Sequence, residues 1–118
     1  MSDDRPREWR IYLDDMITFA SKVISYTNGL DQAGFLANEL VVDATLRNVA
    51  LIGEAARQIP DDIRSQHPEI PRRLITATRN RLIHGYLGID NDTIWSIIHD
   101  DIPELLPLLH TVKAKKQS

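Results

Sequence analysis

The sequence lacks several features that would assign it to a particular class of protein. None of its 118 residues is cysteine, which excludes disulfides, thiolate nucleophiles and zinc sites built on cysteine. No uninterrupted apolar stretch approaches the length of a membrane span. The polar, mixed-charge start at residues 1–7 is not typical of a signal peptide. Together these absences fit a cytoplasmic protein.

A strong excess of charge is also missing, because the formal net charge is only −3. Taken alone, this value argues mildly against a nucleic-acid-binding protein. The basic residues are nevertheless concentrated, since Arg72, Arg73, Arg79 and Arg81 follow one another with no acidic residue among them. A local basic strip on an acidic chain predicts a confined site for phosphate.

What the sequence does contain is helical periodicity in a composition of 42% hydrophobic and 26% charged residues, which is ordinary for a folded domain. The length fits a single domain over residues 1–118 with frayed ends. No segment alternates with period two. We therefore predict an all-α fold, an antiparallel helical bundle with a long central pair of helices.

The helices can be placed by their starts and stops. The first has Pro6 in its first turn and ends at Asn28-Gly29, and Asp31 caps a short second helix. A short turn follows Pro60, and a further helix over about 71–84 is closed by glycine. The apolar face of the first helix consists of Trp9, Tyr12, Leu13, Met16, Ile17, Ala20, Val23 and Ile24.

A long helix is expected from about Glu39 to Gln58, and it is apolar on two faces, which predicts a central helix or one that packs against a second chain. After a helix capped near Asp92, Pro103 is expected to start a last helix. Because Pro107 lies inside that segment, we expect a late start or a bend there. The two faces of the long helix consist of Val41, Ala44, Leu51 and Ala55, and of Val42, Leu46, Val49 and Ala56.

The segment from Arg79 to Tyr86 carries the strongest candidate for chemistry. Arg79 binds phosphate through paired donors, and His84 can accept or donate a proton near neutral pH. Asn80, four residues before His84, can hold the imidazole in one tautomer. These groups suit cleavage of RNA without a metal, with the ribose 2′-hydroxyl as nucleophile. His67, His99 and His110 are scattered, and no cluster with metal-ligand spacing is present.

Helical geometry complicates this site. On an ideal helix Arg79 and His84 lie roughly 140° apart, so one straight helix does not bring both onto a small ligand. Either the helix unwinds at Gly85, or two copies of it meet and share one site. The two apolar faces of the 39–58 helix favour the second solution.

Structural interpretations stand beside these functional ones. His84 can cap its own helix, and Tyr86 can be an amphipathic core residue. Arg72, Arg73 and Arg81 are typical of a solvated face. The remaining candidates also have structural roles: Glu54 can pair with Arg57 or Arg47, and Trp9 and Trp95 are expected in the core.

The spacing Arg79-Asn80-x3-His84-Gly85-Tyr86 resembles the signature of the HepT-like branch of the HEPN domains, found in prokaryotic toxin–antitoxin pairs. The similarity extends along the chain through residues 12–16, 43–55, 93–98 and 102–105. One departure is Arg72, where members often carry tryptophan. The resemblance implies a type VII-like toxin, a homodimeric and metal-independent endoribonuclease. In it Arg79 binds the scissile phosphate, His84 is the acid–base group and Asn80 supports them, in a cleft between protomers.

The resemblance also implies a partner, a minimal MntA-like nucleotidyltransferase antitoxin. This antitoxin would transfer AMP from ATP to Tyr86, using Mg²⁺, while the ribonuclease itself needs no cofactor. The negative charge of the AMP would compete with RNA phosphate for Arg79. In the ribonuclease itself, Arg72, Arg73 and Arg81 would bind further phosphates of the RNA. Two alternatives stay open: a non-catalytic helical dimer that binds a nucleotidyltransferase, nucleotide or RNA, and the substrate-binding half of a split nucleotidyltransferase.

Overall fold

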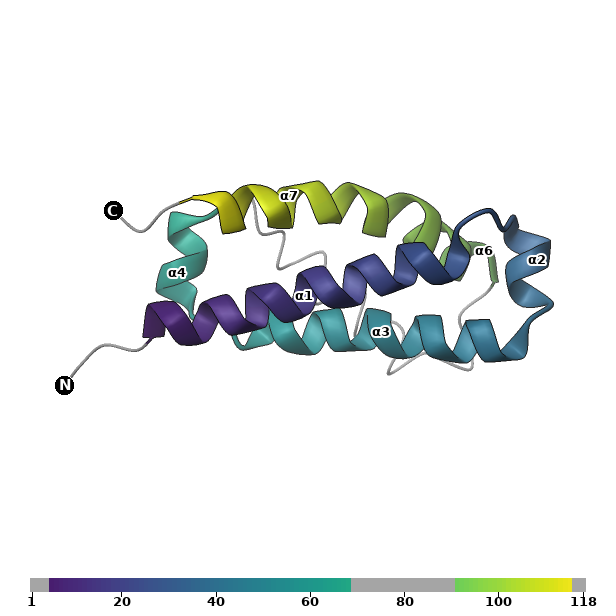
Figure 1. Ribbon diagram of the computed structural model, residues 1–118, viewed down its shortest axis with the longest axis horizontal. Coiled ribbons are helices and arrows are strands. Elements are labelled where there is room, and N and C mark those ends of the chain that lie inside the picture. The colour runs from purple at the N-terminus through teal and green to yellow at the C-terminus, as the bar shows by residue number, and fades with distance from the viewer. Residues whose placement is uncertain (1–4, 69–90, 116–118) are drawn as a thin grey trace.

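The computed structural model describes residues 5–68 and 91–115, and every element in these two stretches is helical (Figure 1). This confirms the predicted all-α fold. Three long helices, α1, α3 and α7, run side by side, and α1 packs most extensively against the other two. The helices are α1 (Arg5–Thr27), α2 (Gln32–Leu36), α3 (Glu39–Arg57), α4 (Asp61–Gln66), α6 (Asn91–Ser96), a π-helical turn η2 (Ile97–Asp101) and α7 (Ile102–Ala114).

Helix α1 is the centre of the described bundle because one of its faces is completely buried. Its buried positions recur at alternating steps of three and four residues, as expected for a helix that packs along its whole length. Tyr12, Ile17 and Ile24 flank this face and are partly buried against the core. The predicted apolar face is thus confirmed. Its fully buried members, each at most 1% exposed, are Trp9, Leu13, Met16, Ala20 and Val23.

The connection from α1 to α3 contains the predicted stop at Gly29 and the predicted cap at Asp31, and a further cap at Asn38 that was not predicted. Gly29 adopts a positive φ of 80° after the last turn of α1, a conformation that glycine reaches without strain. The Asp31 carboxylate accepts a hydrogen bond from the Gly34 amide at 2.8 Å and so caps α2. Asn38 caps α3 in the same way, with its side-chain oxygen 3.1 Å from the Val41 amide.

Helix α3 differs from the expectation of two separate apolar faces. On an ideal helical wheel its buried residues form one continuous arc of roughly 180°. Of the first predicted face, Ala44 and Leu51 lie at or beyond one edge of this arc and are partly exposed, and Val41, in the first turn, is partly exposed as well. The helix therefore packs into its own chain over half its circumference. The buried residues are Thr45, Leu46, Asn48, Val49, Ile52, Gly53, Ala55 and Ala56.

The C-terminal helices α6, η2 and α7 form one continuous helical run, in contrast to the predicted separate helices. Pro103 lies in the first turn of α7, as predicted, but Pro107 does not delay the start of the helix. Proline donates no hydrogen bond to the preceding turn. In the π turn the Ile102 amide donates a hydrogen bond to the Ile97 carbonyl, five residues earlier in the chain instead of four. This wider hydrogen-bond spacing lies directly before Pro103. Pro107 is exposed, so water can reach the backbone around it.

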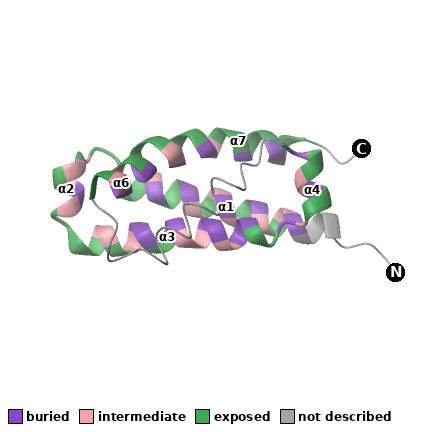
Figure 2. Cartoon of the chain, turned by 180° about the vertical axis from the view of Figure 1, so that it is seen from behind, coloured by how far each residue is buried: buried purple, intermediate pink, exposed green. Residues whose placement is uncertain are grey.

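Buried residues recur along all three long helices (Figure 2). The start of α1 and the end of α7 lie at the same end of the bundle, beside α4, while α2 and α6 lie at the other end (Figure 1). The Arg10 guanidinium donates to the Lys115 carbonyl at 3.1 Å, and Lys113 pairs with Asp14 at 3.1 Å. Among the described helices none is long and apolar enough to cross a membrane.

Candidate functional site

The predicted catalytic residues Arg79, Asn80 and His84 lie outside the described residues, as does Tyr86. The same holds for the predicted phosphate-binding residues Arg72, Arg73 and Arg81. What the structure does describe is the framework on both sides of the 69–90 segment. This framework contributes the two flanking anchors and a groove on the outer side of the bundle.

The anchor before the segment is built on two aromatic rings. His67 follows α4 and is 8% exposed, and Trp9 of α1 is 1% exposed. Their ring centroids are 5.2 Å apart with an interplanar angle of 39°. The Arg10 guanidinium lies over the Trp9 ring, 4.8 Å from its centroid, a cation–π contact. The chain therefore enters the 69–90 segment from a position fixed in the core.

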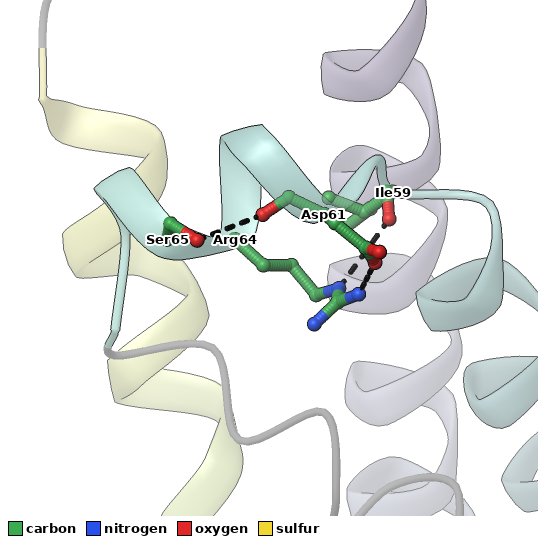
Figure 3. A network of polar contacts seen from close by, with 4 residues as sticks. All are labelled: Ile59, Asp61, Arg64 and Ser65. Carbon is green, nitrogen blue, oxygen red and sulfur yellow. Dashed lines mark hydrogen bonds and ion pairs between the residues drawn. The ribbon is translucent and has the colours of Figure 1, made fainter.

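A network of polar contacts holds together helix α4, which precedes His67 (Figure 3). Arg64 donates from Nε to the Ile59 carbonyl at 3.4 Å and also pairs with the Asp61 carboxylate. Ser65 donates to the Asp61 carbonyl at 3.1 Å. Pro60 provides no side-chain cap for this helix, and these contacts instead tie the Arg64 and Ser65 side chains to the residues at its start.

The anchor after the segment lies at the opposite end of the bundle and is more exposed. Gln32 of α2 donates to the Asp92 carboxylate of α6 at 2.7 Å. The Trp95 ring lies 5.6 Å from the ring of Phe35 and 5.4 Å from that of His99, centroid to centroid. Trp95 is only partly buried and packs against the core from its edge, so its assignment to the core is confirmed in part. The reason is its place on α6, where one side of its ring packs on Phe35 and another on the exposed His99.

A groove runs between α1 and α3, and the sequence did not reveal it. It encloses about 330 Å³ and is open to solvent. Two carboxylates, Asp15 and Glu54, line it together with aromatic and aliphatic side chains. The Glu54–Arg57 ion pair, predicted from the sequence, is present at 4.0 Å. The lining residues are Tyr12, Asp15, Phe19, Leu51, Glu54, Ala55 and Gln58.

The described histidines are not gathered into one site. His67 is buried at the end of α4, His99 lies on the π turn and His110 is exposed on α7. No group of three His, Asp or Glu side chains within residues 5–68 and 91–115 has the arrangement needed to hold a metal ion. Within the described residues, the structure thus shows anchors and surfaces around the 69–90 segment.

The described part of the chain is an all-helical bundle, and its sequence carries the Arg79–His84 spacing; comparison with known proteins shows its family. Residues 16–112 match the family described as Ribonuclease HepT-like. The chain belongs to this family, which confirms the resemblance. It also confirms the prediction that the chain is an enzyme of the ribonuclease class.

Named relatives cover most of the chain. A Methanocaldococcus jannaschii protein named "Putative RNase MJ0125" is 34% identical over 99 residues, 84% of this chain and 85% of the relative. A Thermococcus cleftensis protein named "Probable ribonuclease HepT" is 34% identical over 99 residues, 84% and 90% of the two chains. A Caldanaerobacter subterraneus relative, "Putative RNase TTE0752", is 31% identical over 96 residues, 81% and 86%. No solved structure matches the chain.

Proposed function

We propose that this protein is a metal-independent endoribonuclease toxin of a toxin–antitoxin pair. The observation that carries the proposal is the complete Arg79-Asn80-x3-His84-Gly85-Tyr86 motif inside the span that matches the ribonuclease family. The relatives named as ribonucleases support the same substrate class, RNA.

The proposed reaction uses the RNA's own 2′-hydroxyl as nucleophile. His84 accepts the hydroxyl proton, the 2′-oxygen bonds to the adjacent phosphorus, and the 5′-oxygen leaves with a proton returned by an imidazolium. Arg79 holds the phosphate and stabilises the charge that grows on it. Asn80 orients the imidazole. The products are a 2′,3′-cyclic phosphate and a 5′-hydroxyl end, and the reaction is balanced without a metal.

We propose that two copies share the site. Arg79 and His84 diverge on a straight helix, and a second copy of the same helix resolves this divergence. Arg72, Arg73 and Arg81 extend the positive strip along the bound RNA and hold further phosphates.

Control is proposed at Tyr86. A nucleotidyltransferase antitoxin, using ATP and Mg²⁺, transfers AMP to the Tyr86 hydroxyl, and pyrophosphate leaves. The new phosphodiester places a negative charge two residues from His84, where it repels RNA and competes for Arg79. Co-expression with the nucleotidyltransferase encoded beside the toxin should add whole AMP units to the intact mass. A Tyr86→Phe variant should gain none under the same conditions.

The ribonuclease proposal is tested with purified protein and labelled RNA in excess EDTA. Cleavage should persist in EDTA and leave 2′,3′-cyclic phosphate ends. Arg79→Ala and His84→Ala should each abolish it while the helical circular dichroism signal stays unchanged. Cleavage that survives in both variants would contradict the proposal, as would cleavage that EDTA abolishes.

A second candidate is a dimer that binds RNA, nucleotide or a nucleotidyltransferase without cutting. The form that binds a nucleotidyltransferase is favoured by the net charge of −3 and by the two carboxylates in the α1–α3 groove, because negative charge weakens general attraction for RNA and nucleotide. The same assay separates the candidates. Binding of labelled RNA by gel shift without any product would support this second function.

A further inference from the structure

One outward face of α1 carries a regular stripe beyond its buried core positions. Tyr12, Asp15 and Phe19 line the groove against α3. The same spacing of three and four residues continues to Lys22 and Tyr26, which are exposed on this helix. A period of 3.5 residues is the spacing with which one helix follows another over several turns.

Helix α3 carries the matching stripe on the other side of the groove. Leu51, Glu54 and Gln58 line the groove itself, and the same spacing leads back to Arg47, Ala44 and Leu40. Leu40 is 77% exposed, the highest value among the large exposed apolar side chains of the described chain. Both long helices thus present a mixed apolar and charged row to solvent.

The two antiparallel rows combine into layers across the groove. An acidic layer lies on one side of a central apolar layer, and the register of the helices places a basic layer on the other side. No described residue forms an ion pair with Asp15, Lys22 or Arg47, while Glu54 has the half-exposed pair with Arg57 at 4.0 Å. Continuing the antiparallel register from the groove-lining residues along both helices gives, from one end to the other, the layers Tyr12 with Gln58, Asp15 with Glu54, Phe19 with Leu51, Lys22 with Arg47, and Tyr26 with Ala44.

This sequence of layers is complementary to itself when reversed. Consider a twofold axis that lies in the plane of the face, runs perpendicular to the helices and passes through the Phe19–Leu51 layer. Rotation about this axis gives a second copy whose layers run in the opposite order. The acidic layer of one copy then meets the basic layer of the other. Asp15 faces Lys22 of the second copy, Glu54 faces Arg47, and the central apolar side chains face their own equivalents. Closed twofold interfaces of this kind are isologous.

We propose that the outer α1–α3 face binds a second copy of this chain through this twofold, charge-paired contact. It uses none of the residues of the 79–86 motif and is therefore additional to the shared catalytic site proposed above. Two independent twofold contacts on one chain build an even-numbered assembly larger than a dimer.

The size of the face indicates a modest and salt-sensitive affinity. Helix α3 has 19 residues and is about 28 Å long. Two neighbouring helices about 10 Å apart present a strip about 20 Å wide. The two copies together then bury on the order of 1,000 Å², at the lower end of specific interfaces. Exposed charge pairs around an apolar centre favour specificity and weaken as salt screens them.

The test uses two complementary charge variants of the full chain. One is acidic, Lys22→Glu with Arg47→Glu, and the other is basic, Asp15→Lys with Glu54→Lys. By sedimentation velocity each alone should weaken self-association at this face by at least about tenfold, whereas an equimolar mixture should restore the larger species. Recovery on mixing also shows that both variants are folded.

A cysteine cross-link identifies the face directly, since the chain has no cysteine of its own. Leu51→Cys lies near the proposed axis and should form a disulfide-linked dimer on mild oxidation. Leu108→Cys on α7, another partly exposed leucine, is the matched control and should not. The proposal is overturned if the Leu51→Cys protein fails to cross-link, if the charge variants retain the wild-type mass, or if mixing restores nothing.

Discussion

The two ends of the bundle each carry a Trp–His ring pair, and the two pairs differ in burial. At one end Trp9 and His67 are 1% and 8% exposed, with ring centroids 5.2 Å apart. At the other end Trp95 is partly buried and the His99 side chain is 65% exposed, with ring centroids 5.4 Å apart. Nearly the same ring separation therefore occurs once inside the core and once at the surface.

The difference concerns the described residues on either side of the 69–90 segment. His67 precedes it and packs on Trp9 of α1. Helix α6 follows it and contacts α2 through a surface hydrogen bond and through the partly exposed Trp95 ring, which packs on the buried Phe35 ring. Free energy of burial scales with the apolar area removed from water. The entry to the segment should therefore tolerate substitution much less than the exit.

The largest effect is expected for Trp9→Ala. Removing a fully buried tryptophan leaves a cavity and exposes the His67 ring, and should lower the free energy of unfolding by about 3–5 kcal/mol. Urea denaturation followed by circular dichroism measures this change. Trp9→Phe is the control, since it keeps an aromatic ring against His67 and should lose less.

Trp95→Ala should cost less, about 2 kcal/mol, because this ring is only partly withdrawn from water. The same denaturation experiment on this variant provides the direct comparison. Equal losses for Trp9→Ala and Trp95→Ala would remove the distinction between a core anchor and a surface anchor.

Asp31→Ala removes the side chain that caps α2, at the more exposed end of the bundle. The carboxylate accepts from the Gly34 amide at 2.8 Å, and loss of such a cap costs about 1 kcal/mol. Asp31→Asn retains an acceptor and should recover most of this loss in the same thermal or urea unfolding assay. If Asn is as harmful as Ala, capping is not what Asp31 contributes.

The smallest effect is expected for His99→Ala. The ring is largely exposed and its contact with Asp100 joins neighbouring residues on the surface, so the free energy of unfolding should stay within about 0.5 kcal/mol of wild type. A loss of several kcal/mol would mean that the π turn depends on the His99 ring.

Local signals in the sequence predicted most of the described helices. The capping residue Asp31, the stop at Gly29 and the apolar rows of α1 are all properties of neighbouring residues, and each was found where expected. The course of the chain around Pro103 and Pro107 was predicted less well. Here a π turn at Ile97–Asp101 joins α6 to α7 just before Pro103, and such a shift of hydrogen-bond register has no characteristic residue pattern that could be recognised in the sequence.

Contacts between residues far apart in the chain could not be predicted from the sequence. Trp9 and His67 are far apart in the chain, and only the docking of α4 on α1 brings their rings together. The α1–α3 groove depends in the same way on the register of two antiparallel helices. The motif was predicted from the spacing of Arg79, Asn80, His84 and Tyr86 and from a family resemblance. Membership of the family is now shown, while the roles of these four residues stay predictions.

The central claim is that His84 carries out acid–base chemistry on RNA, and a paired measurement of cleavage rate in EDTA tests it most directly. His84→Ala is compared with His110→Ala, which removes an exposed imidazole from α7. We predict that His84→Ala lowers the rate by at least about 100-fold while His110→Ala leaves it at the wild-type value. Equal rates for the two variants, with both proteins folded, would contradict the account.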